Sequence, residues 1–263
     1  MNTRLLSRFF SKLPRAISSP PRSEPHRVEP LEDRIAPAAI LLTGIDGNRE
    51  TIDFGDGDFT LKAGANKVRI LDSALNVVWS HGAPGIDKLA IDAGSGDFTV
   101  EGWLNKASKF SLTGTGDLSV SGKIIAGNSI SIEGGLVMVS GSLISRDAGG
   151  HGGNIVVTGE NVALIDHARA SASGANGGGS VLIGGDYQGG NSAVHNATHT
   201  FIGADVAIHA DALRHGSGGK VIVWGNEGTK FFGTITARGL SGAGGFVETS
   251  GSSILAFGSV DVS

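Results

Sequence analysis

The chain has 263 residues, no cysteine, a formal net charge of −4 and 40% hydrophobic residues. The lack of cysteine excludes disulfides, thiolate metal sites and cysteine nucleophiles. The mild acidity argues against nucleic acid as a partner, because phosphate binding needs concentrated Lys and Arg. No run of about 18 consecutive apolar residues occurs, so no membrane-spanning helix is expected.

Residues 1–40 differ in composition from the rest of the chain. They hold six of the seven prolines and none of the 43 glycines, with seven Lys or Arg against four Asp or Glu. Residues 41–263 hold 14 basic and 21 acidic residues. Arg8 and Lys12 interrupt the apolar stretch that a secretory signal needs. The segment is therefore predicted to be a basic, proline-rich, disordered leader, and a targeting role stays open.

From about residue 40 onward, short alternating segments are separated by Gly, Asp, Asn and Ser. Strands spaced about 8–12 residues apart predict an all-β protein, with N-terminal solenoid coils at 41–147 and a repeat region at 148–263. The predicted strands are 59–61, 68–71, 89–91, 98–100, 110–112, 118–120, 130–132, 137–139, 155–157, 162–164, 181–183, 201–202, 206–208, 221–224, 231–232, 235–237 and 246–249.

A glycine doublet followed at once by an apolar, mostly β-branched run occurs four times in the repeat region. The second glycines of the doublets are Gly153, Gly179, Gly219 and Gly245, at intervals of 26, 40 and 26 residues. Equal spacing with one longer step is typical of a solenoid in which one coil carries an insertion. A sandwich or a barrel does not require such a period.

Side chains alternate across a strand, so each run should have an inner and an outer face. Two residues after each second glycine, we expect a side chain that points into the core and stacks over its equivalents: Ile155, Val181, Val221 and Val247. Two positions further on, the same face carries Val157, Ile183, Val223 and Thr249. The position between them is expected to face outward, and it admits a charge: Val156, Leu182, Ile222 and Glu248.

The 40-residue interval contains an inserted segment, residues 185–199, that is rich in Gly, Asn and Ser. We expect this segment, called the insert below, to protrude from the solenoid as a polar loop. It is the predicted contact with a partner, through Asp186, Tyr187, Gln188, Asn191 and His195.

Four blocks of the repeat region resemble the haemagglutinin repeats of filamentous-haemagglutinin-like adhesins, which are exported by two-partner secretion. The blocks are residues 178–191 (GGSVLIGGDYQGGN), 218–224 (GGKVIVW), 233–239 (GTITARG) and 244–251 (GGFVETSG). The resemblance implies a right-handed parallel β-helix, on the cell surface or released from it, that serves as a stalk or adhesin.

Residues 28–40 (VEPLEDRIAPAAI) are similar to the N-terminal Leu-Glu-x-Arg-type tag of large repetitive surface proteins of planctomycetes and verrucomicrobia. Two features depart from the two-partner pattern. The chain has no Asn-Pro pair, whereas secretion domains of that family carry an Asn-Pro-x-Gly-type motif, and it ends inside a predicted strand at 259–263. The export route and the completeness of the chain therefore stay open.

Motifs for phosphate and serine-hydrolase chemistry are absent, because the chain has no Walker loop, dinucleotide fingerprint or nucleophile elbow. His195 and His199 have the spacing of a zinc pair on a helix, but they lie in or beside a Gly- and Asn-rich segment. His209, Asp211 and His215 form a loose cluster near a coil corner, where solvated turn residues are the simpler interpretation. No metal and no cofactor is therefore predicted.

Acidic and aromatic residues leave further kinds of site open. Residues 46–48 and 55–58 put carboxylates beside glycine as calcium-binding β-rolls do, although the tandem nonapeptides of such rolls are missing. Asp92, Asp97 and Glu101 are candidates for an acid/base pair in a polysaccharide-active enzyme on the same fold. A carbohydrate-stacking platform would use Trp79, Trp103, Trp224 and Tyr187, although packing in the coil wall is the simpler role for Trp224.

These patterns favour a non-enzymatic adhesin or stalk module that displays loops from a β-helix. We expect it to be secreted, or attached to the cell surface in association with the outer membrane. The expected partners are a glycan or the surface of a host or neighbouring cell, together with an outer-membrane transporter for export. The alternatives are a lyase or glycosidase that acts on polysaccharide, and an inactive fragment of a larger exoprotein.

Overall fold

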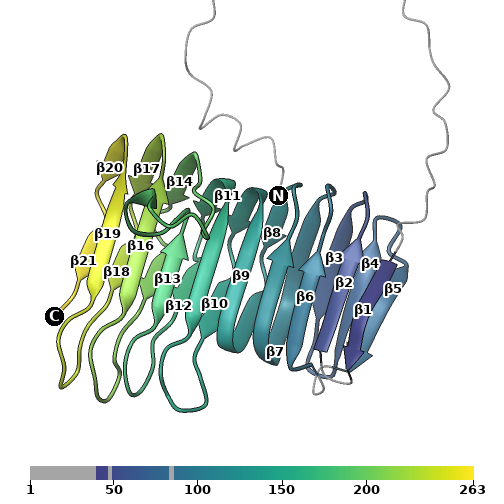
Figure 1. Cartoon of the computed structure of the whole chain (residues 1–263), viewed down its shortest axis with the longest axis horizontal. Helices are drawn as coiled ribbons and strands as arrows, with labels where there is room; N and C mark the ends of the chain where they lie inside the picture. Colours follow the sequence, from purple (N-terminus) through teal and green to yellow (C-terminus); the bar gives the residue numbers. More distant parts are fainter. Residues whose placement is uncertain (1–39, 47–48, 83–85) are drawn as a thin grey trace, which may run out of the picture. The chain divides into compact units, whose positions relative to one another are not determined.

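The computed structural model describes residues 40–46, 49–82 and 86–263, which belong to one compact unit, Pro37–Ser263. Residues 1–39 of the predicted leader lie outside the described residues, as do Gly47 and Asn48 of the acidic turn at 46–48. Within the described part, successive coils of short strands lie side by side (Figure 1). The predicted all-β class and the parallel β-helix are confirmed.

Three sheets enclose the core, and the chain visits them in turn. The first sheet contains β1 (Ile40–Asp46), β2 (Arg49–Phe54), β6 (Lys88–Asp92), β13 (Ser180–Ile183), β16 (Lys220–Gly225) and β19 (Phe246–Gly251). The second contains β3 (Phe59–Ala63), β4 (Lys67–Asp72), β5 (Val77–Gly82), β8 (Leu118–Val120), β14 (His199–Ile202), β17 (Gly228–Phe231) and β20 (Ile254–Ala256). The third contains β10 (Ser142–Ser145), β12 (Arg169–Ser171), β15 (Ala207–His209), β18 (Thr234–Thr236) and β21 (Ser259–Asp261).

Three long strands bend around corners and take part in more than one sheet. They are β7 (Phe98–Thr113), β9 (Lys123–Val139) and β11 (Asn154–Leu164). The predicted strands 98–100 and 110–112 are thus two parts of β7, because its ladder to β9 continues through two register shifts at the corner. Strands β1, β2, β5, β10, β12 and β20 were not predicted. Short Ser- and Ala-containing segments such as β12 lack an apolar signal, and neighbouring coils supply their ladder partners.

The described chain begins with antiparallel pairs and then becomes parallel. β1 pairs with β2, β3 with β4 and β4 with β5 in antiparallel fashion, whereas β2–β6 and β3–β7 are the first parallel pairs. The inner face of this region still supplies the core, since Val68, Ile70 and Trp79 are buried. The antiparallel strands therefore extend the second sheet without breaking the hydrophobic column.

The predicted inward column is present and in register. Ile155 pairs with Val181, Val181 with Val221, and Val221 with Val247, while the first three are fully buried. The same column continues toward the N-terminus through Ile130, Phe110 and Leu89. Each such side chain contributes about 1.5–3 kcal/mol by leaving water, so the column is a main source of stability.

Two side chains predicted to face outward are buried. Leu182 and Ile222 occupy the outward position of β13 and β16, yet they are only 7% and 0% exposed. Both side chains keep the outward position that strand alternation predicts, and their burial means that another part of the chain covers this face. Glu248, at the equivalent position of β19, is half-buried and contacts the insert.

The glycine doublets are explained by close approach between coils. A Cβ on Gly179 or Gly219 would lie within 3.0 Å of the carbonyl oxygen of the equivalent glycine one coil earlier, Gly153 or Gly179. A Cβ on Gly178 would meet the carbonyl of Ala210 just as closely. None of the three has a positive φ, so the space between backbones requires glycine here rather than a left-handed turn.

Candidate functional site

The insert leaves the solenoid after β13 and rejoins it at β14. Its first turn is the 3-10 helix η3 (Tyr187–Gly189), where the Asp186 carboxylate accepts a hydrogen bond from the backbone N–H of Tyr187 (2.8 Å). Gln188 has a φ of 52°, and the N–H of Gly190 donates to the carbonyl of Tyr187 (3.0 Å). The segment therefore has a defined local fold.

The insert packs down onto the first sheet instead of protruding, so the expectation of a protruding loop is wrong. Its glycines leave room for the Trp224 indole, because a Cβ on Gly185 or Gly189 would lie within 3.0 Å of that ring. The Asn196 side chain donates to the carbonyl of Gly189 (2.8 Å), and Ala197 is fully buried. Its helix η3 contacts β16 and β19, so the loop lies against the outward face of the first sheet (green, Figure 1).

Side chains from other coils hold the insert at both ends. At one end, Lys220 Nζ contacts Asp186 Oδ1 (2.7 Å), and Glu248 Oε1 accepts from the N–H of Gln188 (3.2 Å). At the other end, His195 Nδ1 lies 3.3 Å from Glu133 Oε1. A further hydrogen bond joins Thr198 Oγ1 to Glu160 Oε1 (2.6 Å). These contacts run from β9 to β19, so the insert is fixed across neighbouring coils of the solenoid.

Four of the five predicted contact residues are exposed, and the fifth has a different position. Tyr187, Gln188, Asn191 and His195 face solvent, with Tyr187 at 48% exposure. Only 13% of the Asp186 side chain is exposed, and its two oxygens are engaged by Lys220, Tyr187 and Asn191. Asp186 therefore organises the insert from below, and the other four form its outer surface.

An aromatic pair stands at one end of this surface. The Tyr187 ring meets the Phe246 ring edge to face, with centroids 5.7 Å apart, and Phe246 is also 48% exposed. Gln188 Nε2 donates to the Tyr187 hydroxyl (3.0 Å). Asn191 Nδ2 donates to Asp186 Oδ2 (2.9 Å), and the amide oxygen of Asn191 accepts a hydrogen bond from the backbone N–H of Ala193 (3.1 Å). Apolar ring faces and amide groups thus lie side by side.

A shallow groove lies at the other end of the insert. It has a volume of about 230 Å³ and is lined by Thr115, Glu133, Gly134, Gly135, Glu160 and His195. Much of its floor is backbone, because two neighbouring coils present Gly114, Thr115, Gly134 and Gly135 there. The insert supplies one wall through His195, so the groove exists only while the insert is in place.

Acid should release the insert, because Asp186 carries a strongly perturbed pKa. Burial alone would raise this pKa, but hydrogen bonds from Asn191, Lys220 and Tyr187 outweigh it and lower the pKa from 3.8 to about 2. A lowered pKa stabilises the anchored insert above pH 3.8, and this contribution, about 2 kcal/mol, is lost as the pH falls toward 2. We expect the indole N–H of Trp224, which donates to Asn226, to shift in an NMR titration over that interval.

The matched variant for this titration is Asp186→Asn, which cannot titrate. Its Trp224 resonance should already resemble the acid form at neutral pH and should move little between pH 4 and pH 2. Retention of the full acid transition in Asp186→Asn would show that another group controls the insert.

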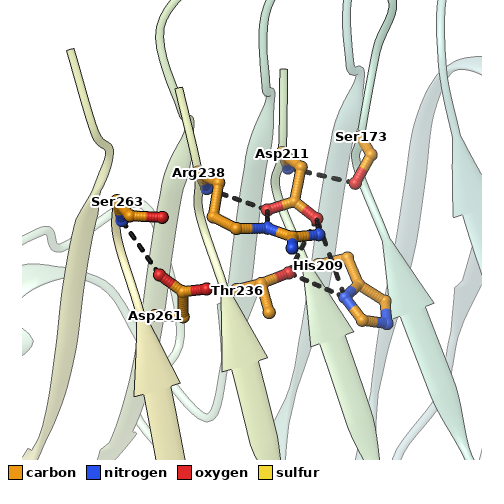
Figure 2. A network of polar contacts seen from close by, with 7 residues as sticks. All are labelled: Ser173, His209, Asp211, Thr236, Arg238, Asp261 and Ser263. Atoms are coloured by element: carbon orange, nitrogen blue, oxygen red, sulfur yellow. Dashed lines mark hydrogen bonds and ion pairs between the residues drawn. The ribbon is translucent and has the colours of Figure 1, made fainter. Parts of the chain in front are cut away.

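The predicted cluster of His209, Asp211 and His215 is only partly assembled. Asp211 is 4% exposed and accepts from Thr236 Oγ1 (2.7 Å) and from the Arg238 backbone N–H (2.8 Å) and guanidinium (3.2 Å). His209 Nδ1 lies 2.8 Å from Thr236 Oγ1 (Figure 2). His215 is exposed on the loop that follows and is not part of the network drawn in Figure 2.

The pKa values around Asp211 fit a structural staple. Burial would raise the pKa of Asp211, but hydrogen bonds from Arg238 and Thr236 lower it overall. Burial and the nearby charges of Arg169 and Arg238 lower the pKa of His209, so its imidazole is neutral at neutral pH. The network joins the carboxyl ends of β15 and β18 (Figure 2). It thereby holds together the two segments that follow these neighbouring strands of the third sheet.

The acidic residues considered for calcium or for acid/base chemistry have separate local partners. Asp92 accepts from the N–H of Gly94 (3.1 Å), and Glu101 pairs with Lys62 (3.5 Å). Asp97 belongs to a staircase in which each carboxylate accepts a backbone N–H of the next coil: Asp58 from Asp97, Asp97 from Asp117, and Asp117 from Leu136. Across the described residues, no group of three or more His, Cys, Asp or Glu is arranged to hold a metal ion.

The four aromatic residues of the proposed stacking platform do not form one surface. Trp79 is 8% exposed in β5, and Trp103 stands 49% exposed beside Lys123. Trp224 lies beneath the insert and Tyr187 lies on its outer side. Sequence reasoning missed Lys220, Phe246, Glu133 and Glu160 as partners of the insert. Alignment of the repeats could have placed Lys220 beside β13, since Ser180 and Lys220 are equivalent positions.

No protein-family model matches the chain, and a search of curated proteins gives no match. Among solved structures, the chain is similar to the crystal structure of the HMW1 secretion domain from Haemophilus influenzae, with 25% sequence identity and a TM-score of 0.37. The match covers 80% of this chain and 59% of that chain. Backbones that superpose this loosely do not establish a common role. Within the residues that the structure describes, no helix has the length and apolar character needed to cross a membrane.

Proposed function

We propose that this chain is a non-enzymatic β-helix module of a secreted or cell-surface protein, and that it binds glycan through the outer surface of the insert. The observation that carries the proposal is the exposed Tyr187–Phe246 pair, which is set among amide groups on a loop anchored to several coils. The resemblance of the repeat region, residues 148–263, to haemagglutinin repeats supports the secreted or surface location.

The anchoring of the insert favours recognition by a prearranged surface. Contacts with Glu133, Glu160, Lys220 and Glu248 fix the loop before any ligand arrives. A ligand then loses less affinity to loop ordering than it would with a free loop. Such a module in a repetitive surface protein would sum many weak contacts through multivalency.

The chemistry of the exposed side chains fits a sugar. A pyranose ring presents an apolar C–H face and a polar hydroxyl edge, and Tyr187 and Phe246 offer ring surface for the first. Gln188 and Asn191 offer amide donors and acceptors for the second. The groove beside His195 lies at the other end of the insert and would take a second part of an extended polymer.

The wider setting belongs to the same proposal. Export would proceed through an outer-membrane transporter, and the ligand would be a surface polysaccharide or a glycan of a host or neighbouring cell. The wild-type full chain should therefore be retained by at least one member of an array of neutral and acidic oligosaccharides. Replacement of Tyr187 by alanine should weaken that binding about tenfold, as loss of one aromatic contact of about 1.4 kcal/mol predicts.

A matched variant separates this effect from general loss of aromatic surface. Trp103→Ala removes another half-exposed aromatic side chain, in β7, and should leave glycan binding unchanged. Both variants should keep the wild-type melting temperature, because neither side chain belongs to the core. Equal affinity of Tyr187→Ala and wild type, or no retention of the wild type by any glycan, would contradict the proposal.

A further inference from the structure

The outward face of β3, β4 and β5 carries a groove that has no part in the insert. Its volume is about 370 Å³, and its lining includes Ala63, Lys62, Lys67, Arg69, Leu71 and Val77. The groove thus joins three cationic side chains to a mainly aliphatic wall. It lies in the antiparallel strands, toward the opposite end of the row of coils from β16 and β19 (Figure 1).

The cationic side chains are arranged at some cost to the fold. Lys62 and Arg69 are direct cross-strand neighbours, and like charges in that position destabilise an antiparallel pair. Lys62 is partly neutralised by Glu101 at 3.5 Å. Lys67 and Arg69 have no ion-pair partner among the described residues. Acid is not scarce, since residues 41–263 hold 21 acidic and 14 basic residues. An anionic ligand would relieve this repulsion.

Two apolar side chains of the same strands and turn are strongly exposed. Leu75, in the turn between β4 and β5, is 68% exposed, and Val77 is 54% exposed. Leu75 has a φ of 66°, a conformation in which Gly or Asn costs less than leucine. The turn is held by Asp72, whose carboxylate accepts from the backbone and side chain of Asn76 (2.8 and 3.1 Å). A strained, solvated leucine does nothing for the core, so its presence points to a ligand.

We propose that this face binds the surface of an anionic lipid bilayer. Lys67 and Arg69, with Lys62, contact lipid phosphates through charge-assisted hydrogen bonds, and Leu75 and Val77 enter the boundary between headgroups and acyl chains. Charge complementarity selects an anion, and the aliphatic side chains select a lipid over a sulfated or carboxylated polysaccharide, which offers them nothing to enter. The site is independent of the glycan surface on the insert.

The test is flotation of the full chain with vesicles of equal parts phosphatidylglycerol and phosphatidylcholine, compared with pure phosphatidylcholine. The wild type should bind only the anionic vesicles. The double variant Lys67→Ser/Arg69→Ser should bind about 25-fold more weakly, at roughly fivefold for each charge removed near an anionic surface. Leu75→Asn fits the same turn and should weaken vesicle binding by about tenfold through loss of apolar burial.

The control is a second pair of neighbouring cations that does not line this groove. Lys88 and Lys109 are exposed and paired across β6 and β7, so Lys88→Ser/Lys109→Ser makes the same change in net charge. It should leave vesicle binding nearly unchanged. Three results would overturn the proposal: no binding to anionic vesicles, an equal loss in the control variant, or full vesicle binding by Leu75→Asn together with equally strong binding of heparin. The last would identify a general polyanion site.

Discussion

Replacement of Val221 by aspartate is expected to unfold the coils around β16 at neutral pH. Val221 is fully buried between Val181 and Val247 in the inward column, where a carboxylate would have no polar partner. An unpaired charge in such a site costs more than about 4 kcal/mol, which is a large part of the stability of a typical domain. Because each coil contacts mainly its neighbours, the loss should spread to the coils on both sides.

Thermal unfolding followed by circular dichroism at pH 7 and pH 4 measures this effect. The loss of melting temperature caused by Val221→Asp should be smaller at pH 4 than at pH 7, because burial raises the pKa of an unpaired carboxyl and favours its neutral form. Thr234→Asp places the same charge on an exposed outward position of β18 and should change stability by no more than about 0.5 kcal/mol. An unchanged melt of Val221→Asp would refute the inward assignment of the column.

The inward column could be predicted from sequence because its determinants are local and repeated. A glycine doublet marks the start of each run, and strand alternation then decides which side chains face inward. This reasoning places Ile155, Val181 and Val221 over one another, as the structure does. The repeat also carried the signal for the insert, since one interval is longer than the others.

The packing of the insert could not be predicted, because its partners are distant in sequence. Glu133 precedes His195 by 62 residues and Glu248 follows Gln188 by 60. Polar composition alone suggested a protruding loop. A signal against that interpretation was available: Leu182 and Ile222 are apolar at outward positions, and two apolar side chains at equivalent sites of adjacent coils need a cover. The insert is the adjacent segment that could supply it.

The antiparallel start and the Asp211 staple escaped prediction for different reasons. β3, β4 and β5 alternate like the later strands, so periodicity cannot tell an antiparallel hairpin from a parallel coil. Asp211 looks like a turn residue because it lies after β15 in a glycine-rich stretch. Its burial depends on Arg238 from the next coil, and only the register of β15 with β18 brings the two together.

The glycine doublets lead to a second prediction with a large effect, that Gly219→Ala will strongly destabilise the solenoid. The added Cβ would lie within 3.0 Å of backbone atoms of Gly178 and Gly179 in the preceding coil. Neither backbone can yield without stretching the ladder between β13 and β16, which runs in register from Ser180 and Lys220 onward. Overpacking of this kind costs about 1–3 kcal/mol or more. We expect the free energy of unfolding to fall by at least about 2 kcal/mol.

Chemical denaturation of the full chain measures this change, and Gly82→Ala provides the matched control. A Cβ on Gly82 meets nothing within 4 Å, and Gly82 does not have a positive φ. The same substitution there removes only unfolded-chain freedom, so stability should stay constant or rise by about 0.4–1 kcal/mol. If Gly219→Ala lowers the free energy of unfolding while Gly82→Ala raises it, then steric contact between coils, and not the conformational freedom of glycine, explains the doublet. Equal, small effects would mean that neighbouring coils can move apart to admit a methyl group, and close backbone approach would then not explain the repeat.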